Sequence, residues 1–65
     1  MTIREIIKAN RISRSLTQEM LAEQLNVTPQ AVSRWETGIS SPDITLLPKI
    51  ADNFNLSVDE LLGTN

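Results

Sequence analysis

Three polar side chains, two of which can form forked hydrogen bonds, lie within residues 30–34. Gln30, Ser33 and Arg34 are spaced so that they lie on one side of a helix, away from Val32 and Trp35. An arginine guanidinium can bind O6 and N7 of guanine together, and a glutamine amide can do the same at adenine. Residue types of this kind on one helix face are able to bind the edges of DNA bases.

The composition argues against most catalytic chemistry. The 65-residue chain contains no cysteine, histidine or tyrosine. It therefore lacks disulfides, thiol nucleophiles, imidazole acid–base groups and the usual zinc ligands. No glycine-rich phosphate loop and no evident pair of catalytic carboxylates are present either. We expect no enzyme activity, no metal, no cofactor and no small-molecule substrate.

The hydropathy of the chain does not indicate a membrane protein. No apolar run approaches the roughly 18 residues of a membrane span, and the N-terminal segment lacks the apolar core of a signal peptide. The absence of cysteine fits a reducing compartment. We expect a cytoplasmic protein with no membrane partner.

The charges are distributed unevenly along the chain. Six basic residues stand against eight acidic ones, for a net charge of −2. Residues 1–37 hold five basic and four acidic residues, whereas residues 38–65 hold one basic and four acidic residues. The first part therefore carries +1 and the second −3, which favours a positive face in the first part.

Start and stop signals predict three helices in the first part of the chain. Thr2, Thr17 and Thr28 can cap helix N-termini, and Pro29 suits the first position of a helix. These signals predict helices over about residues 2–12, 18–25 and 29–37. The apolar residues that recur at helical spacing are expected to form the core: Ile3, Ile6, Ile7, Leu21, Ala22, Leu25, Val32 and Trp35.

Two further helices are predicted after Pro42. Asp43 is expected to cap a helix that ends near residue 53, with Pro48 causing a bend or a loosened first turn. Ser57 and Glu60 have the spacing of a capping box and predict a short helix ending at Gly63. The inward face of the longer helix is expected to contain Ile44, Leu47, Ile50, Ala51 and Phe54.

The second and third helices have the spacing of a helix-turn-helix. Only residues 26–28 separate them, so the two helices meet at a large angle. Ala22 provides the small side chain that the inner corner needs, and Asn26 tolerates the positive φ of the turn. Val27, Val32 and Trp35 are expected to clamp the two helices together.

The run from Leu16 to Gly38, LTQEMLAEQLNVTPQAVSRWETG, resembles the phage Cro/cI-type (Xre-family) helix-turn-helix domain. Residues 41–43 (Ser-Pro-Asp) and 56–62 (LSVDELL) resemble the fourth and fifth helices of that family. The resemblance implies an all-α, lambda-repressor-like domain of five helices over residues 1–65, with the helix-turn-helix at about 17–37. It also implies a sequence-specific transcriptional regulator, most simply a repressor, that reads double-stranded DNA with the third helix.

The resemblance also implies individual contacts. Gln30, Ser33 and Arg34 would face base edges, and Thr28 would lie close to a thymine methyl group or the backbone. Arg11 and Glu36 match a structural ion pair between the first and third helices. Arg14 is a further candidate for phosphate, because few basic side chains of this sequence can reach it. The predicted phosphate contacts are therefore Gln18, Pro29, Thr37, Ser40 and Arg14.

Two departures from the family pattern concern structure. Asn26 replaces the commoner glycine in the turn, which the left-handed conformation tolerates. Asn10 stands where the first helix usually has leucine, so we expect a thinner core beside it.

One recognition helix reads only a few base pairs, so we expect a weak homodimer on a palindromic operator. The last helix is the predicted interface, through Val58 and Leu62, although either side chain could belong to the core instead. The acidic second part of the chain supports an alternative reading. In that reading the same fold is a protein-interaction module, such as an antitoxin or the partner-binding domain of a regulator.

Overall fold

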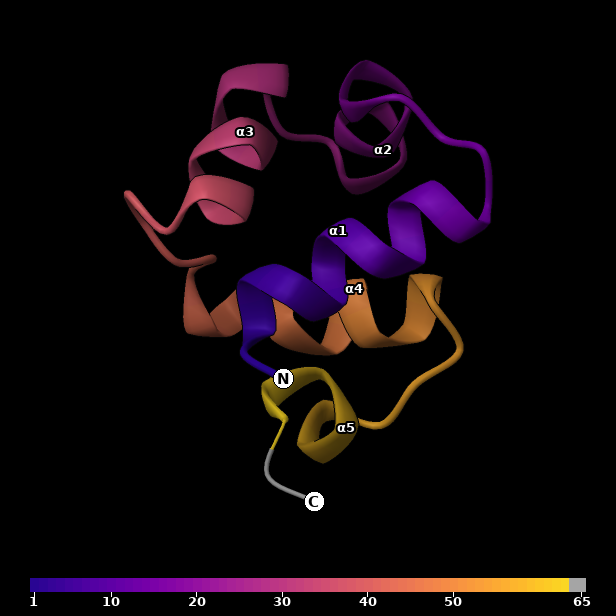
Figure 1. The fold of residues 1–65 in the computed structure, drawn as a ribbon, viewed down its shortest axis with the longest axis vertical. Helices are drawn as coiled ribbons and strands as arrows, with labels where there is room; N and C mark the ends of the chain where they lie inside the picture. Colours follow the sequence, from indigo (N-terminus) through magenta and orange to yellow (C-terminus); the bar gives the residue numbers. More distant parts are fainter. Residues whose placement is uncertain (64–65) are drawn as a thin grey trace.

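The computed structural model describes residues 1–63, which form helices joined by short turns (Figure 1). No strand occurs among these residues, and none of their helices is long and apolar enough to cross a bilayer. The all-α prediction is therefore confirmed. The elements are α1 (Ile3–Ser13), α2 (Gln18–Leu25), α3 (Pro29–Thr37), the 3-10 turn η1 (Ile44–Leu46), α4 (Leu47–Asn53) and α5 (Val58–Leu62).

The predicted caps determine where the helices begin. The hydroxyl of Thr17 accepts a hydrogen bond from the Met20 N–H at 3.0 Å, and that of Thr28 accepts one from the Ala31 N–H at 3.2 Å. The backbone N–H and hydroxyl of Thr2 donate to Glu5 Oε1 at 2.8 and 2.9 Å. These bonds favour the charged carboxylate and lower the pKa of Glu5. Local hydrogen bonds thus start α1, α2 and α3 at the predicted places.

The five α-helices enclose one hydrophobic core. α1 packs against α3 and α5, and α4 packs against α2 and α5. Trp35 is buried, as predicted, and so is Leu61, which the sequence reading did not assign to the core. The core holds Ile6, Ile7, Leu21, Ala22, Leu25, Val32, Trp35, Ile50, Ala51, Phe54 and Leu61. This core sets the angle at which α3 is held against the rest of the molecule.

The prediction that Ile44 faces the core is wrong, because its side chain is 77% exposed. Pro48 has no N–H to donate to the carbonyl of Ile44, so an α-helix cannot include both residues in a regular turn. Residues 44–46 instead form the tighter turn η1, and α4 begins at Leu47. The tighter winding changes the direction of the side chains, and Leu46 packs against the core. The loosened first turn expected from Pro48 is therefore present.

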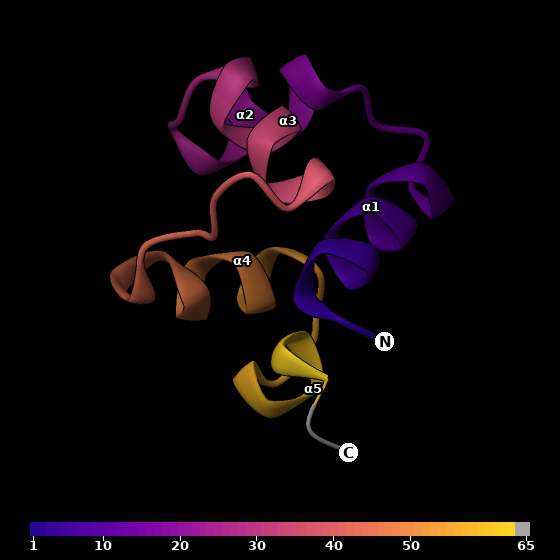
Figure 2. The ribbon, with the colours of Figure 1, turned by 60° about the vertical axis from the view of Figure 1, so that its left-hand side comes forward.

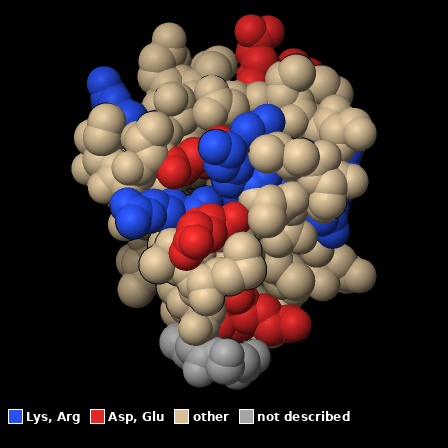
Figure 3. Space-filling model, in the orientation of Figure 1, with Lys and Arg blue, Asp and Glu red and all other residues tan. Residues whose placement is uncertain are grey.

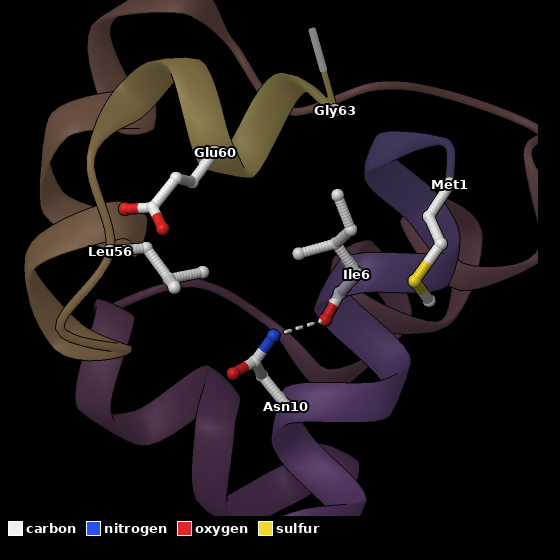
Figure 4. Close-up of a pocket in the computed structure, with 6 residues that line it drawn as sticks. All are labelled: Met1, Ile6, Asn10, Leu56, Glu60 and Gly63. Atoms are coloured by element: carbon white, nitrogen blue, oxygen red, sulfur yellow. Dashed lines mark hydrogen bonds between the residues drawn. The ribbon is translucent and has the colours of Figure 1, made fainter. Parts of the chain in front are cut away.

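A hollow of about 340 Å³ lies between α1 and α5, beside Asn10 (Figure 4). Asn10 does not fill it, because its Nδ2 donates back to the carbonyl of Ile6 at 2.9 Å. Met1, Ile6 and Leu56 contribute apolar surface to the same hollow. The structure thus has an open hollow beside Asn10, where the sequence predicted a thinner core.

Asn10→Leu is expected to raise the free energy of unfolding by about 0.5–2 kcal/mol, because leucine covers this apolar surface and favours helix more than asparagine does. Thermal unfolding would show an increase of about 4–8 °C per kcal/mol for a domain of this size. Asn10→Ala is the control, since both variants lose the bond that Asn10 Oδ1 accepts from Arg14. A leucine variant no more stable than the alanine variant would contradict this expectation.

Candidate nucleic-acid interface

The turn between α2 and α3 depends on a left-handed residue, a backbone hydrogen bond and a small buried side chain. Asn26 takes the left-handed conformation, with φ 59° and ψ 43°. The Val27 N–H donates to the carbonyl of Ala22 at 2.9 Å, which closes the end of α2. Ala22 itself is buried where the two helices meet. The chain can therefore change direction within residues 26–28 and begin α3 at Pro29.

One side of α3 is buried and the other is open. Val32 and Trp35 enter the core, whereas Gln30, Arg34 and Thr37 are exposed. Figure 2 shows α3 in front of α2, with α1 and α4 below. Neither Gln30 nor Arg34 uses its side chain in a hydrogen bond with another described residue, and Ser33 lies half-buried between them. The open face of α3 thus presents the predicted forked donors to an external partner.

An ion pair ties α3 to the rest of the motif. Arg11 donates to Glu36 through Nε at 2.7 Å and through Nη2 at 3.0 Å. Its Nη1 donates to the carbonyl of Leu16 at 2.8 Å. The two side chains are only 13% and 3% exposed. The predicted pair is present, and its bidentate geometry fixes α1 relative to the end of α3.

Gln18 joins this pair, which the sequence reading did not foresee. Its Nε2 donates to Glu36 Oε1 at 3.1 Å, so one of its amide donors is used within the protein. Gln18 is the first residue of α2, where backbone N–H groups have no partner within the helix. Such N–H groups at a helix N-terminus favour a phosphate. The start of α2 therefore offers open backbone N–H groups beside a Gln18 side chain that is partly used within the protein.

The other predicted phosphate contacts differ in how free their donors are. The Thr37 hydroxyl donates within its own helix, to the carbonyls of Ser33 and Arg34 at 3.1 and 3.3 Å. Ser40 is exposed, and its hydroxyl makes no hydrogen bond among the described residues. Pro29 is half-buried at the first position of α3 and has no N–H to offer.

Arg14 lies at the C-terminal end of α1, and its guanidinium is directed toward α4. It donates to the carbonyl of Phe54 at 2.7 Å and to Asn10 Oδ1 at 2.9 Å. The guanidinium carbon also lies 5.2 Å from the centre of the Phe54 ring. These contacts hold the end of α4 against α1, so the structure does not bring Arg14 to the open face of α3.

Basic and acidic side chains are mixed over α1 and α3, whereas the region of α5 is acidic (Figure 3). In Figure 3 the Lys and Arg side chains lie across the middle and upper parts of the face that carries α1 and α3, with acidic side chains between them and at the top of the view. The acidic side chains at the bottom of the same view lie over α5, whose first turn contains Asp59 and Glu60. No group of three acidic side chains within residues 1–63 could hold a metal ion. The acidic first turn of α5 lies at the opposite end of the molecule from α3 (Figure 1).

The geometry of α2 and α3 agrees with a known family, because residues 7–61 match the family model described as helix-turn-helix. The chain belongs to this helix-turn-helix family. It is 42% identical over 63 residues to the HTH-type transcriptional activator BcrR of Enterococcus faecalis, covering 97% of this chain and 31% of that protein. It is 32% identical to the cryptic phage CTXphi transcriptional repressor RstR of Vibrio cholerae serotype O1, covering 97% and 56%.

A solved structure shows the same fold over the whole chain. The P22 c2 repressor, crystallised with the synthetic operator 9T, superposes with a TM-score of 0.91 at 26% identity, covering 100% of this chain and 98% of that one. The lambda-repressor-like fold predicted from the sequence is thereby confirmed. The chain spans about a third to just over half of the length of the curated helix-turn-helix relatives it matches.

One support of the helix-turn-helix was not recognised in the sequence. Lys49 of α4 donates from Nζ to the carbonyl of Leu25 at 3.1 Å, at the C-terminal end of α2. A cation at this position satisfies an open carbonyl and complements the helix dipole. No local sequence signal indicates this contact, because Lys49 and Leu25 are 24 residues apart.

Proposed function

We propose that this chain is a sequence-specific, double-stranded DNA-binding transcriptional regulator of the repressor type, acting by binding rather than by catalysis. The open face of α3 carries the proposal: Gln30 and Arg34 are exposed there, without partners among the described residues, on a helix whose opposite face is in the core. The fold match to a repressor crystallised with its operator supports it. The sequence similarity to two transcriptional regulators, BcrR and RstR, also supports the proposal.

The proposed readout combines base contacts from α3 with phosphate contacts around it. Gln30, Ser33 and Arg34 read base edges, and Thr28 contacts the backbone or a thymine methyl group. Phosphate contacts come from the start of α2 at Gln18 and from the Ser40 hydroxyl after α3. Pro29 can touch the DNA backbone only through its ring, and Thr37 can donate to a phosphate only if its hydroxyl leaves the carbonyls of Ser33 and Arg34. Backbone N–H groups contribute to this grip without any charged side chain, so a chain with net charge −2 can bind DNA.

The experiment that tests this function is a selection of bound duplexes from random double-stranded DNA at low salt. A regulator of this type enriches a palindromic sequence with half-sites about 34–36 Å apart. A protein-interaction module of the same fold enriches no sequence, and that result would overturn the proposal.

We propose that the regulator binds its operator as a weak two-fold dimer through α5. Leu62 is 40% exposed, so it can pack against a second copy. Val58 is half-buried and packs against the core of its own chain, which leaves less of it for a partner. Leu62 therefore carries more of the proposed interface than Val58 does.

Leu62→Glu is expected to abolish cooperative binding to the full palindrome while leaving binding to a single half-site unchanged. A carboxylate in a small apolar contact is costly to desolvate and repels its symmetry mate and the nearby acidic residues. Titration of both duplexes, with sedimentation of the free proteins, would measure the effect. Asp52→Ala, an exposed site on α4, is the control. Wild-type cooperativity in the Leu62 variant would exclude α5 as the interface.

A further inference from the structure

The side chain of Arg4 lies across the C-terminal end of α3. Gly38, which ends α3 with φ 82°, leaves the space that this side chain occupies. A Cβ atom at residue 38 would lie 3.2 Å from Cδ and 3.3 Å from Cζ of Arg4, and closer still to Nη1. The first turn of α1 thus delivers a guanidinium to the point where α3 meets the loop that follows it.

The guanidinium of Arg4 has no hydrogen-bond acceptor within the described part of the chain. The other two arginines in and just after α1 do have acceptors. Arg11 is held by Glu36 and the carbonyl of Leu16, and Arg14 by Asn10 and the carbonyl of Phe54. The neighbouring carboxylate of Glu5 accepts from Thr2 instead. The donors of Arg4 are therefore open to an external anion.

The loop beside Arg4 offers few donors of its own. The N–H groups of Gly38, Ile39 and Ser40 point back into α3, where they donate to carbonyls of Trp35 and Arg34 at 3.3, 3.0 and 3.4 Å. The Thr37 hydroxyl is also directed into the helix. An anion at this end of α3 would find the Ser40 hydroxyl and a guanidinium, but no free row of backbone N–H groups.

We infer that Arg4 binds a phosphodiester group of the operator at the C-terminal end of α3. The inference rests on the proposed function: a helix seated in the major groove has a sugar-phosphate backbone along each side of the groove. A guanidinium matches the geometry of two phosphate oxygens. Arg4 has this role, whereas Arg11 of α1 and Arg14, which follows α1, support the fold.

The test compares Arg4→Gln with Lys8→Gln on the duplex selected by the wild-type protein. Both substitutions remove one positive charge from exposed positions one turn apart on α1. Arg4→Gln is expected to weaken binding about tenfold per half-site at low salt. The substitution is also expected to reduce the steepness with which the logarithm of the association constant falls with the logarithm of the salt concentration, by about 0.9 per subunit. Lys8→Gln should have a clearly smaller effect on both quantities, and thermal unfolding of both variants should match the wild type.

Duplexes with single phosphates replaced by neutral methylphosphonates locate the contact. One such replacement per half-site should weaken the wild type but leave the Arg4→Gln variant unaffected. The inference is wrong if Arg4→Gln and Lys8→Gln weaken binding equally. It is also wrong if no methylphosphonate replacement distinguishes Arg4→Gln from the wild type. In either case the positive charge of Arg4 attracts DNA without binding a particular phosphate. If the wild type selects no sequence at all, the proposed function fails, and this inference fails with it.

Discussion

Glu36→Ala is expected to lower the free energy of unfolding by about 3–5 kcal/mol, the usual cost of breaking a buried ion pair from one side. The carboxylate accepts two hydrogen bonds from Arg11 and one from Gln18, with its side chain only 3% exposed. Without it, the Arg11 guanidinium keeps only the carbonyl of Leu16. A domain this small has little stability to spare. The variant should therefore be largely unfolded.

Urea unfolding followed by the fluorescence of Trp35 would measure this loss, since Trp35 is buried and is the one tryptophan of the sequence. Glu19→Ala is the matched control, because Glu19 is an exposed carboxylate on α2. A loss below about 1 kcal/mol in the Glu36 variant would place the pair among weak surface ion pairs and contradict the expectation.

The double variant Arg11→Met with Glu36→Leu separates the structural role from a role in binding. Apolar side chains of similar volume can replace a buried ion pair at little cost. The double variant should therefore recover most of the stability that Glu36→Ala loses. If it also binds the selected duplex as the wild type does, Arg11 has no direct contact with DNA.

Arg34→Ala is expected to have the largest effect on sequence readout. Loss of a forked contact to guanine costs about 1–3 kcal/mol per recognition helix, and a two-fold dimer loses it twice. The Arg34 side chain is exposed and makes no hydrogen bond within residues 1–63, so the fold should be unaffected. Repeating the duplex selection with this variant should show a relaxed preference at one base pair of each half-site.

Lys8→Ala is the control for this prediction, because it removes the same charge from α1 rather than from the open face of α3. It should weaken all duplexes to a similar small extent and leave the base preferences unchanged. Unchanged base preferences in the Arg34 variant would show that this residue does not read the sequence.

The amino-acid sequence by itself determined the helices and the place of the helix-turn-helix. The caps at Thr17, Thr28 and Ser57 act within three residues along the chain. The left-handed turn at Asn26 and the short turn before Pro48 are equally local. Because these effects depend on neighbouring residues only, the sequence pattern was enough to locate them. The open face of α3 followed from its periodicity in the same way.

The tertiary structure alone decided that Arg4 remains available for a ligand and that Arg14 does not. Four arginines occur in residues 1–37. Periodicity places Arg34 on the open face of α3, and the family resemblance implies the pair of Arg11 with Glu36, but nothing in the local sequence distinguishes Arg4 from Arg14. Folding pairs Arg11 with Glu36, 25 residues away, and directs Arg14 to the carbonyl of Phe54, 40 residues away. It lays Arg4 over Gly38 without an acceptor. A long side chain takes the partners that packing brings within its reach, and those partners come from distant parts of the chain.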